Sequence, residues 1–176
     1  MIRKIAITGP ESTGKSLLAE QLAHHYKTVW VPEYARTYLE KLNHPYQETD
    51  IIKIAKGQIR EELLRQNQAS RFLFCDTEIV VVKIWSEVKY NRCHPWILKM
   101  IENHRYDLFL LCDIDLPWEP DPLREHPDKR KFLFDLYHQE LSGRKFPFYI
   151  VTGEGESRKS NAISFIENYF QHICYL

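Results

Sequence analysis

The residues Gly9-Pro10-Glu11-Ser12-Thr13-Gly14-Lys15-Ser16 form a complete G-x-x-x-x-G-K-[ST] pattern near the start of the chain. An apolar run of strand length, residues 2–8, leads into this stretch, and a segment with helical spacing, residues 15–26, follows it. A strand, a glycine-rich loop and a helix in this order provide the context that a phosphate-binding loop requires. The stretch therefore predicts a site for a nucleoside triphosphate.

The residue types in this loop suit phosphate. Glycines at both ends let the backbone curl so that its N–H groups point at phosphate oxygens, and the following helix adds its positive end. We expect Lys15 to reach the β and γ phosphates and the Ser16 hydroxyl to ligate magnesium. Phosphates would repel a carboxylate, so the Glu11 side chain is expected to point outward or to bond to the loop itself. The predicted nucleotide-binding residues are Gly9, Glu11, Ser12, Thr13, Gly14, Lys15, Ser16 and Leu17.

Five apolar runs of strand length alternate with longer segments of helical spacing. This alternation is typical of an α/β fold with a parallel sheet, and nearly continuous apolar runs are typical of strands covered on both faces. We therefore predict a P-loop NTPase with a five-stranded parallel sheet flanked by helices. The predicted strands are residues 2–8, 28–31, 72–75, 107–112 and 146–151, and the predicted helices are residues 15–26, 32–42, 50–68, 77–90, 129–141 and 157–170.

The composition is that of one ordinary globular domain, since the chain has 176 residues and a domain holds about 150. The 24 lysines and arginines balance the 24 aspartates and glutamates, which disfavours a nucleic-acid partner. No apolar run approaches the roughly 20 residues that cross a bilayer, so no membrane role is expected. No leader is seen and no C-x-x-C pair occurs among Cys75, Cys93, Cys112 and Cys174, so we expect a reduced, cytoplasmic protein.

The features that accompany the loop narrow the class of P-loop protein. A GTPase would carry an N-K-x-D tetrapeptide, which the sequence lacks, and a motor or remodelling ATPase would need a longer chain. The size fits small-molecule kinases, which add an acceptor-binding insert and a lid to the sheet. We assign residues 32–68 to the insert and residues 116–130, which are rich in proline, to the lid. A plain surface connection is the alternative for the proline-rich segment.

Polar residues follow three of the predicted strands at the edge of the sheet where ligands of α/β folds gather. Asp76 is expected to hold magnesium through water or to take a proton from an acceptor hydroxyl, although it would also suit the N-cap of the next helix. Glu33 is expected to bind ribose hydroxyls, and Arg36 to bind phosphate or to fix Glu33. An acid that complements a helix dipole is the alternative for Glu33. Asp113 and Asp115 are weaker candidates.

The predicted lid carries Arg124 and Arg130, either of which would stabilise a transferring phosphoryl group, and we favour Arg124. A planar substrate needs one or two aromatic faces, although most aromatic residues at such spacings belong to the core. The eight histidines show no metal-ligand spacing. The loop 152–155 after the last strand is a candidate to hold the nucleotide base. The aromatic candidates are Trp30, Tyr34, Tyr38, Trp85 and Tyr90.

Several stretches occur in a family-specific order along nearly the whole chain. They are Gly9 to Ser16, Glu33-Tyr34-x-Arg36, Asp76-Thr77-Glu78, His94-Pro95, Phe109-Leu110-Leu111 and Trp118-x-x-Asp121-x-Leu123-Arg124. In this order they resemble the ribosylnicotinamide kinase domain of NadR-type proteins. The family often has tryptophan immediately before Glu-Tyr, where this chain has Pro32. NadR-type proteins commonly carry an adenylyltransferase domain ahead of the kinase, so the resemblance implies a stand-alone kinase or one domain of such a protein.

The resemblance implies transfer of the γ-phosphate of ATP to the 5′-hydroxyl of nicotinamide riboside, giving nicotinamide mononucleotide for NAD salvage, with ATP and Mg²⁺ as cofactors. The catalytic residues would be Lys15, Asp76, Arg124 and Glu33, and the metal site would be Ser16 and Asp76. The alternatives are a kinase for another nucleoside or small metabolite, and an ATP-dependent regulatory switch. The sequence does not indicate an oligomeric state. The predicted substrate-binding residues are Glu33, Tyr34, Arg36, Asp76, Trp85 and Tyr90.

Overall fold

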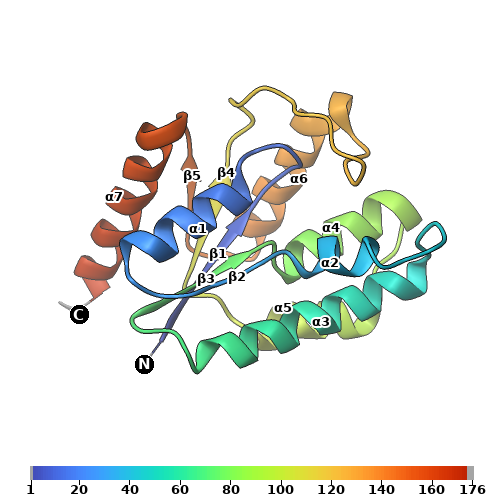
Figure 1. Cartoon of the computed structure of the whole chain (residues 1–176), viewed down its shortest axis with the longest axis horizontal. Helices are drawn as coiled ribbons and strands as arrows, with labels where there is room; N and C mark the ends of the chain where they lie inside the picture. Colours follow the sequence, from blue (N-terminus) through green and yellow to red (C-terminus); the bar gives the residue numbers. More distant parts are fainter. Residues whose placement is uncertain (1, 174–176) are drawn as a thin grey trace.

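The computed structural model describes residues 2–173, which form a five-stranded sheet with helices on both faces (Figure 1). Cys174 lies outside the described residues. All strand pairs are parallel, and the order is β2-β3-β1-β4-β5, so the strand that carries the phosphate loop is central. The predicted sheet is confirmed. The strands are β1 (Arg3–Thr8), β2 (Trp30–Val31), β3 (Phe72–Asp76), β4 (Leu108–Cys112) and β5 (Phe148–Val151).

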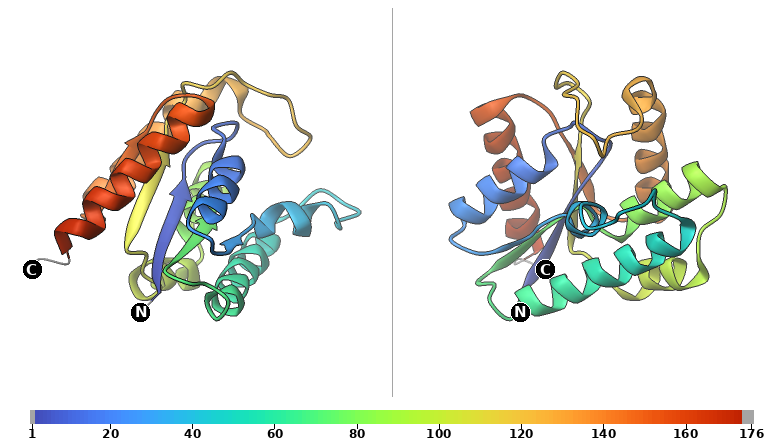
Figure 2. Two further views of the ribbon diagram at one scale, coloured as in Figure 1. Left: turned by 60° about the vertical axis from the view of Figure 1, so that its left-hand side comes forward. Right: turned by 45° about the vertical axis from the view of Figure 1, so that its right-hand side comes forward.

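Seven α-helices and one short 3-10 helix are present among the described residues. Alternate residues of the central strand face opposite layers: Ile5 and Ile7 pack with α1 and α7, whereas Ala6 packs with the helices of the other layer. Figure 2 shows the two layers on either side of the strands. The helices are α1 (Lys15–His25), α2 (Tyr34–Leu39), α3 (Glu48–Gln66), α4 (Ile79–Tyr90), α5 (Pro95–Asn103), η1 (Pro127–Lys129), α6 (Arg130–Gly143) and α7 (Gly155–Ile173).

The sequence did not predict α5. His94 precedes this helix, and its ring Nδ1 accepts a hydrogen bond from the Trp96 N–H at 3.1 Å, so a histidine takes the place of the usual N-cap residue. Pro95 follows at the first helical position, where proline is tolerated. The residues that begin this helix could therefore have been recognised in the sequence, but the helix itself has only nine residues. None of the helices within residues 2–173 is long and apolar enough to cross a membrane.

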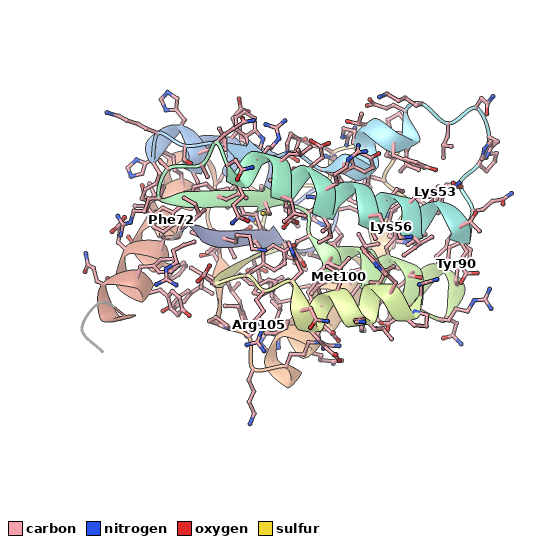
Figure 3. All side chains as sticks on the ribbon, turned by 90° about the horizontal axis from the view of Figure 1, so that it is seen from below. Lys53, Lys56, Phe72, Tyr90, Met100 and Arg105 are labelled. Atoms are coloured by element: carbon pink, nitrogen blue, oxygen red, sulfur yellow. The ribbon has the colours of Figure 1, made fainter. Side chains whose placement is uncertain are left out.

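The helix after β2 is shorter than predicted, and it is fixed by a close contact with α3. The ring of Tyr34 lies against the backbone of Gly57, where a Cβ atom would stand 1.9 Å from the ring. The Tyr34 N–H also donates to the Gln58 side-chain oxygen at 2.9 Å. Figure 3 shows the same layer from below, with Lys53 and Lys56 on α3. This contact fixes the start of α2 against α3, and so it also fixes the position of the residues next to Tyr34.

We predict that Gly57→Ala destabilises the fold, although replacing glycine by alanine inside a helix ordinarily stabilises by up to about 1 kcal/mol. The added Cβ displaces the Tyr34 ring, so the free energy of unfolding should fall by about 1–3 kcal/mol. Urea unfolding followed by circular dichroism measures the change. Gly143→Ala is the matched control, because no atom lies within 4 Å of the position of its Cβ. Equal effects of the two substitutions would contradict this account.

Candidate active site

A cavity of about 860 Å³ opens at the edge of the sheet where the strands end. The phosphate loop, the turn after β2, α4, the segment after β4 and the start of α7 all contribute to its wall. The proline-rich segment runs along the top of the molecule in Figure 1. In an open parallel sheet this edge is where ligands bind. The cavity therefore brings together most of the candidate residues that lie far apart in the sequence.

The phosphate loop has the curled backbone that its glycines predict. Gly9 has φ of 129°, and a Cβ atom there would lie 2.9 Å from the Cys112 carbonyl oxygen, so only glycine fits. The Thr13 hydroxyl donates to the Pro10 carbonyl at 2.8 Å. Lys15 Nζ donates to the same carbonyl at 2.6 Å. The loop thus holds its own lysine at the mouth of the cavity.

Two other loop residues bind the proline-rich segment. Glu11 Oε2 accepts hydrogen bonds from the backbone N–H groups of Glu125, at 3.0 Å, and His126, at 3.1 Å. The Ser12 hydroxyl accepts the Glu119 N–H at 2.8 Å. Of the two expectations for Glu11, the outward direction holds and a bond to its own loop does not, because the segment after β4 offers its backbone N–H groups to the Glu11 carboxylate.

Asp76 is 2% exposed and ends β3 beside the phosphate loop. Burial raises the pKa of the Asp76 carboxyl, while a hydrogen bond with Ser16 and the charge of Lys15 act in the opposite direction. Thr77 follows with φ of 61°, which is unusual for a β-branched residue and turns the chain sharply. The N-cap alternative for Asp76 is wrong: α4 begins at Ile79, and Glu78 is its N-cap.

Glu33 lines the cavity at the start of α2. Burial raises the pKa of its carboxyl, and the negative charge of Asp76 adds to this rise, while Lys15 and Arg36 oppose it. Glu33 stands at the N-cap position, yet its side chain makes no capping hydrogen bond within the described part of the chain. Arg36 pairs with Asp121 of the proline-rich segment, with Nη2 3.1 Å from Oδ2. Arg36 therefore ties that segment to α2.

Among the predicted aromatic faces, Trp85 is the one that lines the cavity within residues 2–173. Tyr34 and Tyr90 are not among the described residues that line the cavity. Tyr34 packs on α3. Tyr90, at the end of α4, packs against the core (Figure 3). Their roles in substrate binding stay predictions. Tyr46 lines the cavity but was missed. Its ring centroid lies 5.0 Å from that of Trp85, and its hydroxyl accepts Trp85 Nε1–H at 3.0 Å.

Both arginines of the predicted lid, Arg124 and Arg130, reach the phosphate loop. Arg124 Nη1 donates to the Ser12 hydroxyl at 3.3 Å, and its guanidinium lies 6.0 Å from the Trp118 ring centroid. Arg130 Nη2 donates to the Ser12 carbonyl at 3.0 Å. Arg124 also lines the cavity, and its action on a transferring phosphoryl group stays a prediction.

Arg158 was also missed, although it joins four chain segments beside the loop. Its side chain is 5% exposed. Its guanidinium donates to Asp115 Oδ1 and the Gly153 carbonyl, both at 2.7 Å, and to the carbonyls of Thr13 at 2.9 Å and Asp113 at 3.1 Å. Nothing local marks this residue, because it lies in the first turns of α7 and its partners are distant in sequence.

The loop between β1 and α1, the central parallel strand and the sheet order define a P-loop nucleoside-triphosphate-binding fold. A family model described as an AAA domain matches residues 4–158. The chain belongs to this family.

The chain is also similar to the trifunctional NAD biosynthesis/regulator protein NadR of Escherichia coli strain K12, with 33% identity over 129 residues. The matched region covers 70% of this chain and 31% of that protein, so the chain spans about a third of its relative's length. The resemblance to NadR-type proteins is thereby confirmed.

Solved structures share the fold. A NadR structure in complex with NAD and AMP-PNP matches with a TM-score of 0.79 and 22% identity, over 96% of this chain and 49% of that chain. A NadR structure in complex with NR matches with a TM-score of 0.80 and 21% identity, over 96% and 50%. Deoxyadenosine kinase from M. mycoides with bound dATP matches with a TM-score of 0.62 and 15% identity, over 94% and 99%. The predicted kinase-like P-loop fold is confirmed.

We predict that Glu78 makes the fold less stable as the pH rises. Its carboxyl is fully buried, and burial raises its pKa from 4.5 to about 8, although it accepts hydrogen bonds from Thr8 and Val80. The folded protein therefore binds a proton that the unfolded chain releases above pH 4.5. The free energy of unfolding should fall between about pH 5 and pH 8, and Glu78→Gln should flatten this fall.

Denaturant unfolding at several pH values measures the slope. Glu20→Gln is the control, because Glu20 is exposed on α1 and its removal should keep the wild-type slope. A Glu78→Gln variant with an unchanged slope would show that another group causes the fall.

Proposed function

We propose that the chain is an ATP- and magnesium-dependent kinase that phosphorylates the 5′-hydroxyl of nicotinamide riboside to give nicotinamide mononucleotide. One observation carries the proposal: the wall of one cavity combines a phosphate loop, a carboxylate, Glu33, and an aromatic pair, Tyr46 and Trp85. Similarity to NadR supports it, and that relative is described as a NAD biosynthesis protein. NR is bound in one NadR structure of the same fold.

The donor end of the cavity suits ATP. The loop N–H groups would bind the β and γ phosphates, and Lys15 would exchange the Pro10 carbonyl for phosphate oxygens. Arg158 would act as a positioning residue, because it holds the loop carbonyl of Thr13 against the 152–155 segment. Glu154 and Gly155 line the cavity on that side, where the base would lie. AMP-PNP is bound in one NadR structure of this fold.

The Ser16 hydroxyl and the Asp76 carboxylate suit magnesium. Both offer oxygen atoms as ligands. Asp76 ends β3 beside the phosphate loop, and its burial makes ionisation of its carboxyl costly unless a cation lies near it. Magnesium prefers such donors together with water and phosphate oxygens, and no cage of protein ligands is needed. When bound, the ion would neutralise phosphate charge. No group of three or more His, Cys, Asp or Glu residues suited to a metal occurs in the described part of the chain.

The acceptor end would be built by the insert, residues 32–68, together with α4. Tyr46 and Trp85 would present aromatic surface to the nicotinamide ring. Glu33 lies in the cavity wall, whereas Asp76 is almost fully buried beside Ser16, so we assign the base to Glu33 and the metal side to Asp76. Arg36 lines the cavity and would belong to the acceptor site itself. Tyr34 and Tyr90 would support that site from outside the cavity wall.

The reaction follows from this arrangement. The 5′-hydroxyl oxygen bonds to the γ-phosphorus while the bond between that phosphorus and the β–γ bridging oxygen breaks. The hydroxyl proton passes to the Glu33 carboxylate, and ADP leaves. Lys15 and Arg124 supply positive charge for the transferring group, and residues 116–130 act as the lid that excludes water. We place this enzyme in the cytoplasm, without a nucleic-acid or membrane partner, on the basis of its composition.

The proposal predicts turnover of nicotinamide riboside by the purified chain with ATP and magnesium. When a panel of nucleosides is compared, nicotinamide riboside should show the highest kcat/KM for 5′-phosphate formation. Lys15→Ala should lower kcat by about 100-fold or more with the circular dichroism spectrum unchanged, because it removes charge that stabilises the transition state. Preference for another nucleoside would replace the substrate assignment. Tight ATP binding without any product would favour the regulatory switch.

The assignment of Glu33 as the base predicts a pH profile. A base must be ionised to accept a proton, so kcat/KM should fall as the pH falls through the raised pKa of Glu33. Glu33→Gln should lower kcat by about 100-fold or more and remove this acid limb. Asp76→Asn should instead raise the magnesium concentration needed for half-maximal rate and keep the limb. The opposite result for the two variants would make Asp76 the base.

A further inference from the structure

Glu125 lies where the lid, the phosphate loop and the acceptor wall meet. Its backbone and its side chain bind different parts of the cavity. Its N–H donates to Glu11 Oε2 at 3.0 Å, and the next N–H, that of His126, donates to the same oxygen at 3.1 Å. One carboxylate oxygen of the phosphate loop thus binds two successive lid amides.

The Glu125 side chain points to the opposite wall. Its Oε2 accepts the Tyr46 hydroxyl at 3.0 Å and Lys89 Nζ at 3.1 Å. Tyr46 in turn accepts Trp85 Nε1–H at 3.0 Å, and Lys89 Nζ lies 5.0 Å from the centroid of the Tyr46 ring. The chain of contacts therefore runs from Trp85 through Tyr46 and Glu125 to Glu11, across the mouth of the cavity.

We propose that Glu125 is a positioning residue that couples the nucleoside subsite to the phosphate loop through the lid. The inference rests on the proposed function for the identity of the two ligands. A nucleoside against Tyr46 and Trp85 orders the side-chain contacts of Glu125. This favours the lid position in which the backbone of Glu125 binds the loop at Glu11. ATP on the loop favours the same lid position from the other side, so each ligand strengthens binding of the other.

The weakness of the contacts suits this role. The Glu125 and Lys89 side chains are 34% and 39% exposed, and exposed ion pairs contribute little to stability when isolated. This ion pair alone therefore does not fix the lid, and a ligand that orders Tyr46 can change the population of the lid position. The lid also contacts α2 through the ion pair of Asp121 with Arg36, but this ion pair does not involve Tyr46 or Trp85. Within the described part of the lid, Glu125 contacts both Tyr46 and the phosphate-loop residue Glu11.

The first test measures how AMP-PNP changes the affinity for nicotinamide riboside, by calorimetry on the whole chain with magnesium. In the wild type AMP-PNP should tighten nicotinamide riboside binding by about 5-fold or more. Glu125→Gln should bind each ligand alone within about twofold of the wild type and reduce the coupling to below about twofold. Asp128→Asn, which removes the same charge from an exposed lid residue, should keep the wild-type coupling.

The second test needs no ligand. Tyr46→Phe keeps the ring but removes the hydroxyl that Glu125 accepts, so hydrogen exchange at the Glu125 and His126 amides should be faster than in the wild type. Asp128→Asn should leave this exchange unchanged. Full coupling in Glu125→Gln, an equal loss in Asp128→Asn, or unchanged exchange in Tyr46→Phe would each overturn the proposal. A wild type that binds no nicotinamide riboside would instead contradict the proposed function, and the exchange measurement would still decide the link.

Discussion

The end of β1 passes so close to β4 that only a glycine can stand there. At Gly9 a Cβ atom would lie 2.9 Å from the Cys112 carbonyl oxygen, and the backbone has φ of 129°. Because the chain turns at this point, the following residues curl before α1 begins after Gly14. The turn gives the loop two sides: Lys15 and Ser16 face the end of β3, whereas Glu11 and Ser12 face the lid.

Charge around the cavity is balanced locally. Glu33 and Asp76 are acids whose pKa values are raised by burial, and Lys15 and Arg36 oppose both rises. Two carboxylates near a phosphate loop would repel a nucleotide unless a cation or a proton compensates them. In the proposed reaction one carboxylate faces magnesium and the other receives a proton, so each has its compensation. A formal net charge of zero is therefore compatible with phosphate chemistry at one edge of the sheet.

The sequence predicts what local pattern determines. The phosphate loop is specified by residues adjacent in sequence, and the strands are specified by apolar runs, so both were predicted closely. Tyr46 and Arg158 escaped prediction because their partners are set by tertiary structure: Trp85 for the first, and Asp115 with Thr13 for the second. Tyr34 is an aromatic residue in the family stretch Glu33-Tyr34-x-Arg36, which predicts a place in the acceptor site. Its ring instead lies on α3, where Gly57 has no side chain to occupy that space.

The predicted lid, residues 116–130, contacts the phosphate loop on a side that the proposed function does not assign to phosphates. Glu11 and the Ser12 hydroxyl take lid N–H groups, while the pattern assigns the loop's own N–H groups to phosphate. Donor binding and lid binding therefore do not compete for the same hydrogen-bonding groups, and the loop can hold both at once. This explains why a glutamate is tolerated in an anion-binding loop. The Glu11 carboxylate accepts hydrogen bonds from backbone N–H groups of the predicted lid, so these groups compensate its negative charge away from the place assigned to the phosphates.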